Sequence, residues 1–401
     1  MTVIVQKFGG TSVRSEDRRL AASRHVEKAV EDGHKVIVVV SAIGRLGDPY
    51  ATDTLLELLS NEDLTSSTRE QDLLVSCGEI ISSVVFTGLL RSLGLNAMAF
   101  TGAQAGFRTN EDFGKASILD MECEHLKAML HKVDVAVVAG FQGESPGGET
   151  TTLGRGGSDT SATALGVAME ADYVDIFTDV NGIMTADPGI VQEVSVIESV
   201  TYQEICNMAY QGAKVIHPRA VEIAMQAEIP VRIRSTLSDE PGTLISTASK
   251  IKTALNERQV TGIAHMAGLS QITVRSKEYL TLQDNVFYEM AKAGISVDFI
   301  NIQPSAVVYT VPDERADEAL RALRAKGYEP ECLSHCAKIS AIGAGMTGVP
   351  GVASKIVAAL TKENIQIYQS ADSHTTIWVL VEEGDMKKAV RALHQMFQLE
   401  H

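Results

Sequence analysis

Short runs of apolar residues alternate with amphipathic stretches along the first 235 or so residues. The apolar runs are rich in valine and isoleucine and predict strands at 3–7, 36–40, 97–100, 135–139, 174–177 and 231–233. Between them, apolar positions recur at helical spacing and predict helices, among them 71–90 and 123–131. Because the strand-like runs are continuous, we expect strands buried on both faces. The pattern therefore predicts an α/β fold with a mostly parallel sheet sandwiched by helices.

A repeat follows a stretch rich in Ser, Thr, Pro and Gly at 235–256. Residues 286–297 align with 356–367 without a gap, at a shift of 70 (356 minus 286), and the register persists to identical Arg-Ala-Leu triplets at 321 and 391. Each copy predicts a ferredoxin-like βαββαβ unit, and two copies are typical of a paired regulatory module. We expect a first domain at 1–247, a linker at 248–260, and repeats at 261–332 and 333–401.

Composition and charge limit the class of protein, its partners and its location. Of 401 residues, 45% are hydrophobic and 21% charged, as in an ordinary globular protein, and the net charge of −16 disfavours nucleic acid or anionic membrane as a partner. We identify no membrane-length apolar run and no secretion leader. Five scattered cysteines predict no disulfide framework and a cytoplasmic location. Cys332 and Cys336 flank His335, but nothing nearby completes a zinc site, so we expect no protein-bound metal.

The first candidate for chemistry lies between the first predicted strand and the next helix. Here Lys7 precedes the pair Gly9-Gly10, and Thr11-Ser12 can cap the helix. Glycines let the backbone approach an anion closely, and a helix N-terminus favours negative charge, so the loop suits a polyphosphate. It is not a Walker loop, since the lysine precedes the glycines. A surface lysine beside a tight turn is the alternative.

A second glycine-rich loop, Gly-Arg-Gly-Gly-Ser-Asp at 154–159, also opens a helix. Its Arg155 can hold a carboxylate through two parallel hydrogen bonds. A flexible surface loop with Ser158 or Asp159 as a helix cap is the alternative, although capping does not explain the arginine.

Further polar residues are less informative alone. The segment 177–188 contains two turns, Asp-Val-Asn-Gly and Ala-Asp-Pro, and by itself is no more than a loop. Ser41 follows a predicted strand, and Glu79 lies in an apolar part of helix 71–90, where burial toward a site is plausible. The match to G-x-G-x-x-G at 343–348 opens the second small repeat, not a doubly wound sheet, so an effector-binding loop fits it better than a dinucleotide site.

Together these motifs resemble the aspartokinases of the amino-acid kinase superfamily. Lys-Phe-Gly-Gly-Thr-Ser at 7–12, the 154–159 loop, the 178–188 loop and Gly-Ala-Lys-Val at 212–215 occur in the family's order, and the paired repeats resemble tandem ACT domains. The resemblance covers essentially the whole chain. It implies ATP-dependent phosphorylation of the side-chain carboxylate of L-aspartate to 4-phospho-L-aspartate, the entry to lysine, threonine, methionine and diaminopimelate synthesis.

The resemblance also implies roles for individual residues. Lys7 would contact the transferring phosphoryl group, and Mg²⁺ would bridge the ATP phosphates. Lys7 and Asp159 are the residues expected to be catalytic. In the aspartate pocket, Arg155 would hold the α-carboxylate and Glu79 the α-ammonium. Ser41 and Asp159 would complete the pocket, and Ser158 is also expected to bind substrate. The expected nucleotide-contacting positions are Lys7, Phe8, Gly9, Gly10, Thr178, Asp179, Met184, Asp187 and Lys214. Two departures from the family are Met184, where many relatives have tyrosine, and Gly189, where arginine is common.

The same resemblance predicts feedback control and assembly. An amino-acid effector (diaminopimelate, lysine or threonine, with diaminopimelate preferred) would bind the ACT repeats near 293–301, 343–351 and 369–375. ACT sheets commonly pair edge to edge, so we expect a homodimer. The alternatives are a non-catalytic amino-acid sensor on a kinase scaffold and a kinase for glutamate or acetylglutamate.

Overall fold

The computed structural model divides the chain into two compact units. It describes residues 2–60, 66–213, 215–249, 259–276, 279–346 and 349–400. The first unit comprises Met1–Ile183, Val196–Ala209 and Lys214–Ala254, and the second comprises Met184–Ser195, Tyr210–Ala213 and Leu255–His401. The expected linker at 248–260 lies mostly outside the described residues.

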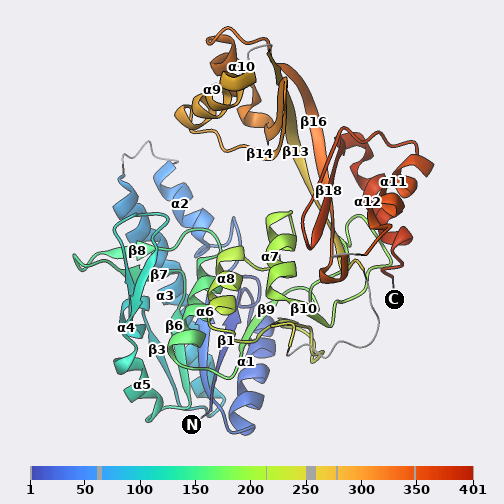
Figure 1. The fold of residues 1–401 in the computed structure, drawn as a ribbon. Coiled ribbons are helices and arrows are strands. Elements are labelled where there is room, and N and C mark those ends of the chain that lie inside the picture. Colours follow the sequence, from blue (N-terminus) through green and yellow to red (C-terminus); the bar gives the residue numbers. More distant parts are fainter. Residues whose placement is uncertain are drawn as a thin grey trace. The chain divides into compact units, whose positions relative to one another are not determined.

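The first unit is built on an eight-stranded sheet (Figure 1). The strand order is β10-β12-β11-β9-β1-β2-β6-β3, and every pair is parallel except β11 with β12. The strands are β1 (Val3–Phe8), β2 (Lys35–Val40), β3 (Ala97–Phe100), β6 (Val135–Ala139), β9 (Val174–Thr178), β10 (Ser199–Thr201), β11 (Val231–Ser235) and β12 (Thr243–Ser246). The expected mostly parallel sheet is confirmed.

Helices cover both faces of this sheet. The helices of the unit are α1 (Glu16–Glu31), α2 (Thr52–Ser60), α3 (Thr68–Ser92), α4 (Gly102–Ala105), α5 (Glu124–Leu130), α6 (Gly157–Ala168), α7 (Tyr202–Tyr210) and α8 (Pro218–Gln226). Helices α1 and α3 share one apolar core with β1, β2 and β6, in which Phe8 and Phe86 are fully buried. Helix α6 packs on β1 and β9 and also against α8.

A second, small sheet was not expected from the sequence. Its order is β5-β4-β7-β8, from β4 (Phe107–Thr109), β5 (Ile118–Met121), β7 (Gln142–Glu144) and β8 (Thr150–Thr152). Strand β8 packs along α3 and leads directly into the Arg155 loop. The small sheet therefore connects the long helix to one of the candidate loops.

Helix α3 corrects the expectation that no segment has the length and apolarity of a membrane span. By length and composition alone it qualifies, as do many core helices of proteins outside membranes, and half of its most apolar window is buried inside the protein. The helix also carries two buried acids, Asp72 and Glu79. We therefore interpret α3 as a core helix of the first unit.

The second unit contains the two predicted repeats. A six-stranded antiparallel sheet has the order β14-β15-β13-β16-β18-β17. The elements are β13 (Gly262–Arg275), α9 (Tyr279–Lys292), β14 (Asp298–Gln303), β15 (Ala306–Pro312), α10 (Asp313–Arg324), β16 (Glu331–Ile342), η1 (Ala344–Met346), α11 (Val352–Lys362), β17 (Gln369–Asp372), β18 (Thr376–Glu382), η2 (Glu383–Asp385) and α12 (Met386–Met396). Helices α9 and α10 enclose one core and α11 and α12 another, as the repeat predicts.

The two repeats share their long strands. The first part of β13 pairs with β16 at 338–342, beside β18, whereas its last part pairs with β15 and with the start of β16 at 331–333. The register shifts between these parts, at residues 266–271 of β13. Each long strand therefore contributes to both halves of the module.

Close packing among the described residues explains why position 343 is a glycine. A Cβ there would lie 2.4 Å from the carbonyl oxygen of Gln259, so only glycine allows this close approach of two backbone segments. Residues 347 and 348 of the glycine motif lie outside the described residues, and the expected effector role of this loop stays a prediction.

Candidate active site

The candidate residues gather at the carboxyl edge of the main sheet. Strands β9, β1, β2 and β6 are adjacent and parallel, so the loops that follow them lie along one edge. Lys7 is next to last in β1, Ser41 follows β2, Phe141 comes two residues after β6, and Thr178 ends β9. Open parallel sheets bind ligands at this edge.

Lys7 forms the central ion pair of the site. Its Nζ lies 2.7 Å from Oδ1 of Asp159, in the first turn of α6, and both side chains are 13% exposed. This pairing keeps a positive charge at the sheet edge without burying it alone. The structure thus brings together the two residues expected to be catalytic, and their catalytic roles stay predictions.

The glycine pair after β1 interlocks with the loop after β2. A Cβ on Gly10 would lie 2.6 Å from the carbonyl oxygens of both Ala42 and Gly44, so no side chain fits there. The amide of Gly44 donates to the carbonyl of Gly10 at 3.0 Å, and the amide of Ser41 to that of Phe8 at 3.1 Å. The loop that carries Ser41 is therefore held against the loop that follows Lys7.

Glu79 is buried, and no basic side chain of the described residues forms an ion pair with it. It is 2% exposed; its Oε1 accepts a hydrogen bond from the amide of Ala42 at 3.0 Å, and its Oε2 has no hydrogen-bond partner among the described residues. Burial raises the pKa of Glu79 to about 8, although the Ala42 amide partly opposes this. A cationic group of a ligand would satisfy the free oxygen, which agrees with the expected contact to an ammonium.

Arg155 is exposed on a tightly held loop. The flanking glycines both have positive φ, 73° at Gly154 and 70° at Gly156, and a Cβ on Gly156 would lie 2.3 Å from the ring of His217. Among the described residues Arg155 has no hydrogen-bond or ion-pair partner, so its guanidinium is available to a ligand carboxylate.

Phe141 is a strained residue that sequence reasoning missed. Its φ of 69° is unusual for a bulky side chain, and its backbone is fixed by Ser161 Oγ, which accepts from its amide at 3.0 Å, and by the amide of Leu153, which donates to its carbonyl at 2.8 Å. Ser158 is buried nearby, within 3.1 Å of where a Cβ on Gly140 would be. Strain of this kind is concentrated at functional sites.

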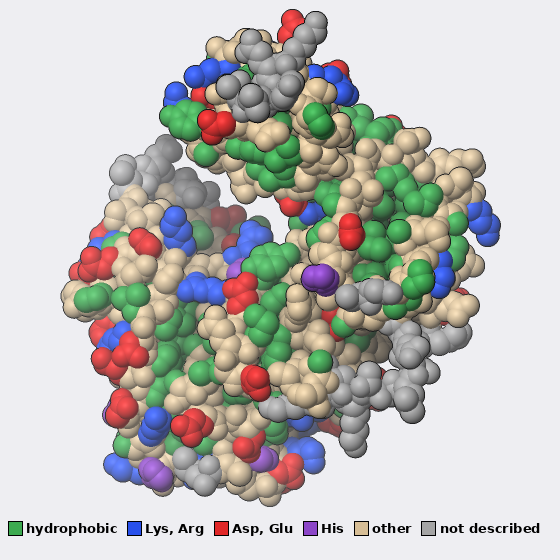
Figure 2. Space-filling model, viewed as in Figure 1, with side chains coloured by type: hydrophobic (Ala, Val, Ile, Leu, Met, Phe, Trp, Pro, Cys, Tyr) green, Lys and Arg blue, Asp and Glu red, His purple; other side chains and the backbone are tan. Residues whose placement is uncertain are grey.

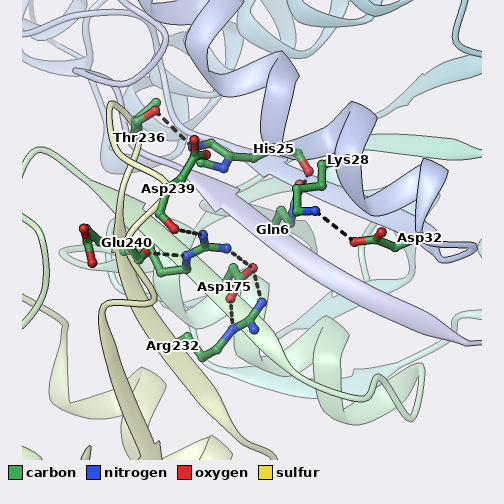
Figure 3. Close-up of polar contacts among 10 residues, drawn as sticks. Gln6, His25, Lys28, Asp32, Asp175, Arg232, Thr236, Asp239 and Glu240 are labelled. Atoms are coloured by element: carbon green, nitrogen blue, oxygen red, sulfur yellow. Dashed lines mark hydrogen bonds and ion pairs between the residues drawn. The ribbon is translucent and has the colours of Figure 1, made fainter. Parts of the chain in front are cut away.

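A buried ionic network joins strands β9 and β11 next to this edge. Asp175 of β9 is fully buried and accepts two hydrogen bonds, at 2.6 and 2.7 Å, from Arg232 of β11 (Figure 3). Arg234 lies 3.6 Å from the same carboxylate and also donates to the carbonyl oxygens of Asp239 and Glu240. The network ties β9 to β11 and to the loop after it.

Thr236, which follows β11, forms hydrogen bonds with the loop after β1 and with the end of β9. Its Oγ1 donates to Ser12 Oγ at 2.7 Å, its amide donates to the carbonyl of Thr178 at 3.0 Å, and its own carbonyl contacts the buried ring of His25 at 3.1 Å (Figure 3). Asp179, the residue after Thr178, is exposed, and its carboxylate lies 3.3 Å from the guanidinium of Arg45. Thr178 and Asp179 therefore lie at the same edge as Lys7.

The remaining expected nucleotide positions fare differently. The side chain of Phe8 is fully buried and stacks on Phe177 at 4.7 Å, so its backbone is the part that is open to a nucleotide. The expected nucleotide contact of Phe8 stays a prediction. Met184 and Asp187 belong to the second unit, and Lys214 lies outside the described residues. The roles of these three residues stay predictions.

Within the described part of the second unit, three side chains of types that bind metals lie close together. Atoms of Asp313, His335 and Glu383 lie within 4.8 Å of one another. They already bind the bulged strands: His335 lies 3.5 Å from Asp313, and Glu383 accepts from the amide of Gly268 at 3.2 Å. We assign no metal to this exposed group.

The surface agrees with a localised attraction for anions. On the face drawn in Figure 2, acidic and basic side chains of the described residues are interspersed. In a chain with a net charge of −16, anionic substrates depend on local cations such as Lys7 and Arg155. The arrangement can hold two anions near one lysine and so suits transfer of a phosphoryl group to a carboxylate.

Comparison with known proteins agrees with this chemistry. Residues 2–235 match the model of the amino acid kinase family, and residues 331–395 match an ACT domain model. The chain is 57% identical over 403 residues to Aspartokinase 1 of Bacillus subtilis (strain 168), with 100% of both chains covered. Its fold is similar to E. coli aspartokinase III in complex with aspartate and ADP (R-state), with a TM-score of 0.79, 27% identity, and coverage of 98% and 99%. The complex of the same enzyme with lysine and aspartate (T-state) gives a TM-score of 0.75 at the same identity and coverage.

The chain is thus an amino acid kinase with an ACT module. More narrowly, it belongs to the aspartokinases: it phosphorylates aspartate at the expense of ATP and is regulated allosterically through its ACT domains.

Proposed function

We propose that phosphoryl transfer takes place between Lys7, Glu79 and Arg155, at the carboxyl edge of the main sheet. The observation that carries the proposal is the Lys7–Asp159 pair beside the glycine loops. An aspartate side chain has a pKa of about 3.9 and is ionised at neutral pH, so the attacking oxygen needs no general base. The remaining task is to bring two anions together, and Lys7 offsets their repulsion at the transferring group.

Substrate orientation is divided between two side chains. Arg155 binds the α-carboxylate of aspartate through its planar fork, and Glu79 receives the α-ammonium with its free oxygen; Ser41 and Ser158 complete the pocket. With its α-carboxylate and α-ammonium held in this way, the aspartate substrate directs its side-chain carboxylate at Lys7. The exposure of Arg155 and the unpartnered Oε2 of Glu79 support this assignment.

The nucleotide is placed by backbone amides of Gly9 and Gly10 and by the Thr178-Asp179 turn. We propose Mg²⁺ as the companion of ATP, where it neutralises phosphate charge. Magnesium favours oxygen ligands and usually binds through one or two carboxylates and substrate phosphates. Asp159 and Asp179 are each paired with a cation, so phosphate oxygens and water would supply most of the ligands of Mg²⁺.

An assay of the acyl phosphate tests the proposed roles. Purified enzyme with ATP, Mg²⁺ and aspartate should release ADP and yield aspartyl hydroxamate in the presence of hydroxylamine, whereas glutamate should not substitute. Arg155→Lys should raise the KM for aspartate at least tenfold with a smaller effect on kcat, because a point charge replaces a fork. An unchanged KM would contradict the role of Arg155, and absence of aspartate-dependent ADP release would favour the sensor alternative.

For regulation, we propose that the effector binds a polar pocket of the second unit. The pocket has a volume of about 280 Å³ and lies between the edge strands β14 and β17. It is lined by Asn301, Gln303, Val308, Ile367, Tyr368, Gln369 and Ser370. Its amide and hydroxyl groups suit the zwitterionic head of an amino acid. We favour diaminopimelate over lysine and threonine, and inhibition titrations with each compound decide between them.

We propose a homodimer formed through the same edge strands. Strand β14 ends the sheet and exposes Ile300 and Ile302, at 47% and 51%. Unpaired edges of this kind favour association. Light scattering of the purified enzyme should give twice the monomer mass. We also place the enzyme in the cytoplasm, in keeping with five cysteines that are all free.

A further inference from the structure

Asp72 is a buried acid that the catalytic roles above leave unexplained. It lies near the start of α3 and is 2% exposed. Both carboxylate oxygens are used: Oδ2 accepts from the amides of Gly114 at 2.9 Å and Thr152 at 2.8 Å, and Oδ1 accepts from Thr152 Oγ1 at 2.7 Å. Among the described residues no basic side chain forms an ion pair with it. A buried carboxylate without a cation is costly, and these three donors are what stabilise it.

The two segments that Asp72 joins converge on the Arg155 loop. Thr152 is the last residue of β8, three positions before Arg155, and Gly114 lies in the turn between β4 and β5. The amide of Ala116 donates to the carbonyl of Thr152 at 2.8 Å, and a Cβ on Gly154 would lie 3.1 Å from the carbonyl oxygen of Gly114. Asp72 therefore fixes the backbone from which the loop emerges.

A second side chain holds the same backbone from α8. Arg219 Nη1 donates to the carbonyls of Ala116 at 3.2 Å and Leu153 at 3.4 Å. The ring of His217, at the N-terminus of α8, packs against Gly156. The loop is thus held on both sides, although Arg155 itself has no partner among the described residues.

We propose that Asp72 is a positioning residue for aspartate recognition, which acts by fixing the backbone that presents Arg155. Arg219 assists from the opposite side. The inference rests on the proposed role of Arg155. A loop held before the substrate arrives loses less conformational entropy on binding and presents its guanidinium in the productive direction. Loosening the loop should weaken aspartate binding selectively, because the hydrogen bonds of Asp72 go to Gly114 and Thr152 and not to Lys7 or the Thr178 turn.

The primary test is Asp72→Asn in the full-length enzyme. Asparagine keeps the shape but places an NH₂ group against the donors of Thr152 or Gly114, so at least one charge-assisted hydrogen bond is lost. We expect the KM for aspartate to rise about tenfold, with kcat and the KM for ATP within about threefold of wild type. The matched control is Asp175→Asn, another buried acid of the same unit, which should lower the melting temperature and leave the KM for aspartate unchanged.

A double-mutant cycle separates positioning from general destabilisation. With Arg155→Lys already in place, adding Asp72→Asn should change the aspartate KM by less than about twofold, since the presented group is already impaired. A full additional tenfold increase, or equal losses in kcat and in both KM values, would overturn the proposal. If Arg155→Lys itself leaves KM unchanged, the proposed function of the loop fails instead.

Arg219→Gln keeps the proposal testable if Asp72→Asn does not fold. It removes the donor to Ala116 and Leu153 from the other side of the loop and should also raise the aspartate KM selectively. An aspartate KM equal to that of wild type in this variant would count against loop positioning.

Discussion

At the scale of single residues, the proposed site contains charges that we assign to the reaction and other charges that hold the backbone. Lys7 and Arg155 stand in glycine-rich loops, where a cation is conspicuous in the sequence. Asp72 and Arg219 lie in helices, where nothing in the sequence distinguishes them from residues of a solvated face. The sequence could therefore indicate the residues proposed to contact substrate, but it could not indicate those proposed to position them.

Replacing Lys7 tests the charge at the transferring group. Lys7→Met should lower kcat by about three orders of magnitude, because positive charge aimed at the developing transition state is removed. Steady-state kinetics with coupled ADP detection gives the change, and circular dichroism checks that the variant is folded. Turnover within tenfold of wild type would remove Lys7 from the phosphoryl site.

Glu79 should make aspartate binding depend on pH. Its pKa of about 8 means that it is mostly protonated at pH 7, whereas the α-ammonium of aspartate favours the ionised form. Binding should therefore release a proton, and the KM for aspartate should fall as the pH rises from 6.5 to 8. Calorimetry in buffers of different ionisation enthalpy measures the proton.

Glu79→Gln is the companion variant for this titration. It should weaken aspartate binding and abolish both the proton release and the slope of KM with pH. A slope that persists in Glu79→Gln would assign the titration to another group.

At the scale of elements, local pattern predicted the main sheet but not the small one. The core strands are continuous apolar runs, and the predictions at 97–100 and 135–139 coincide with β3 and β6. Strands β4, β7 and β8 have three residues each, and β8 is Thr-Thr-Thr, so neither length nor alternation marks them. Their pairing depends on contacts distant in sequence, such as that of β8 with α3.

The stability of the first unit should depend on one buried carboxylate, that of Asp175 between β9 and β11. Asp175→Asn leaves Arg232 and Arg234 without their shared anion and should lower the free energy of unfolding by about 3 kcal/mol. Denaturant unfolding followed by fluorescence measures this. The matched control is Asp134→Asn, whose ion pair with Lys35 at 2.8 Å is far more exposed and should cost less than about 1 kcal/mol. Equal effects of the two variants would contradict a special contribution from the buried network.

At the scale of the whole molecule, each unit contains, among its described residues, one buried histidine that should resist protonation. Burial lowers the pKa of His25 in the first unit, although the carbonyl of Thr236 opposes it, and burial also lowers the pKa of His394 in the second. A histidine with a lowered folded pKa takes up its proton more readily when unfolded. Its contribution to stability is therefore complete above pH 6.5 and is lost as the pH falls below that value.

Scanning calorimetry checks this expectation for both units. The melting temperature should fall as the pH is lowered from 7.5 to 5.5. His25→Gln should reduce the pH dependence of the melting temperature of the first unit alone. A melting temperature that is independent of pH over this interval, or an unchanged slope in His25→Gln, would show that other groups control acid stability.

The exchange of strands between the repeats has a consequence for engineering inhibitor response. Because β13 and β16 each complete both halves of the sheet, a single repeat excised from the chain, or grafted in from a relative, leaves a half-strand without its mate. To give the enzyme a new feedback specificity, both repeats should therefore be replaced together, or single residues within them should be changed.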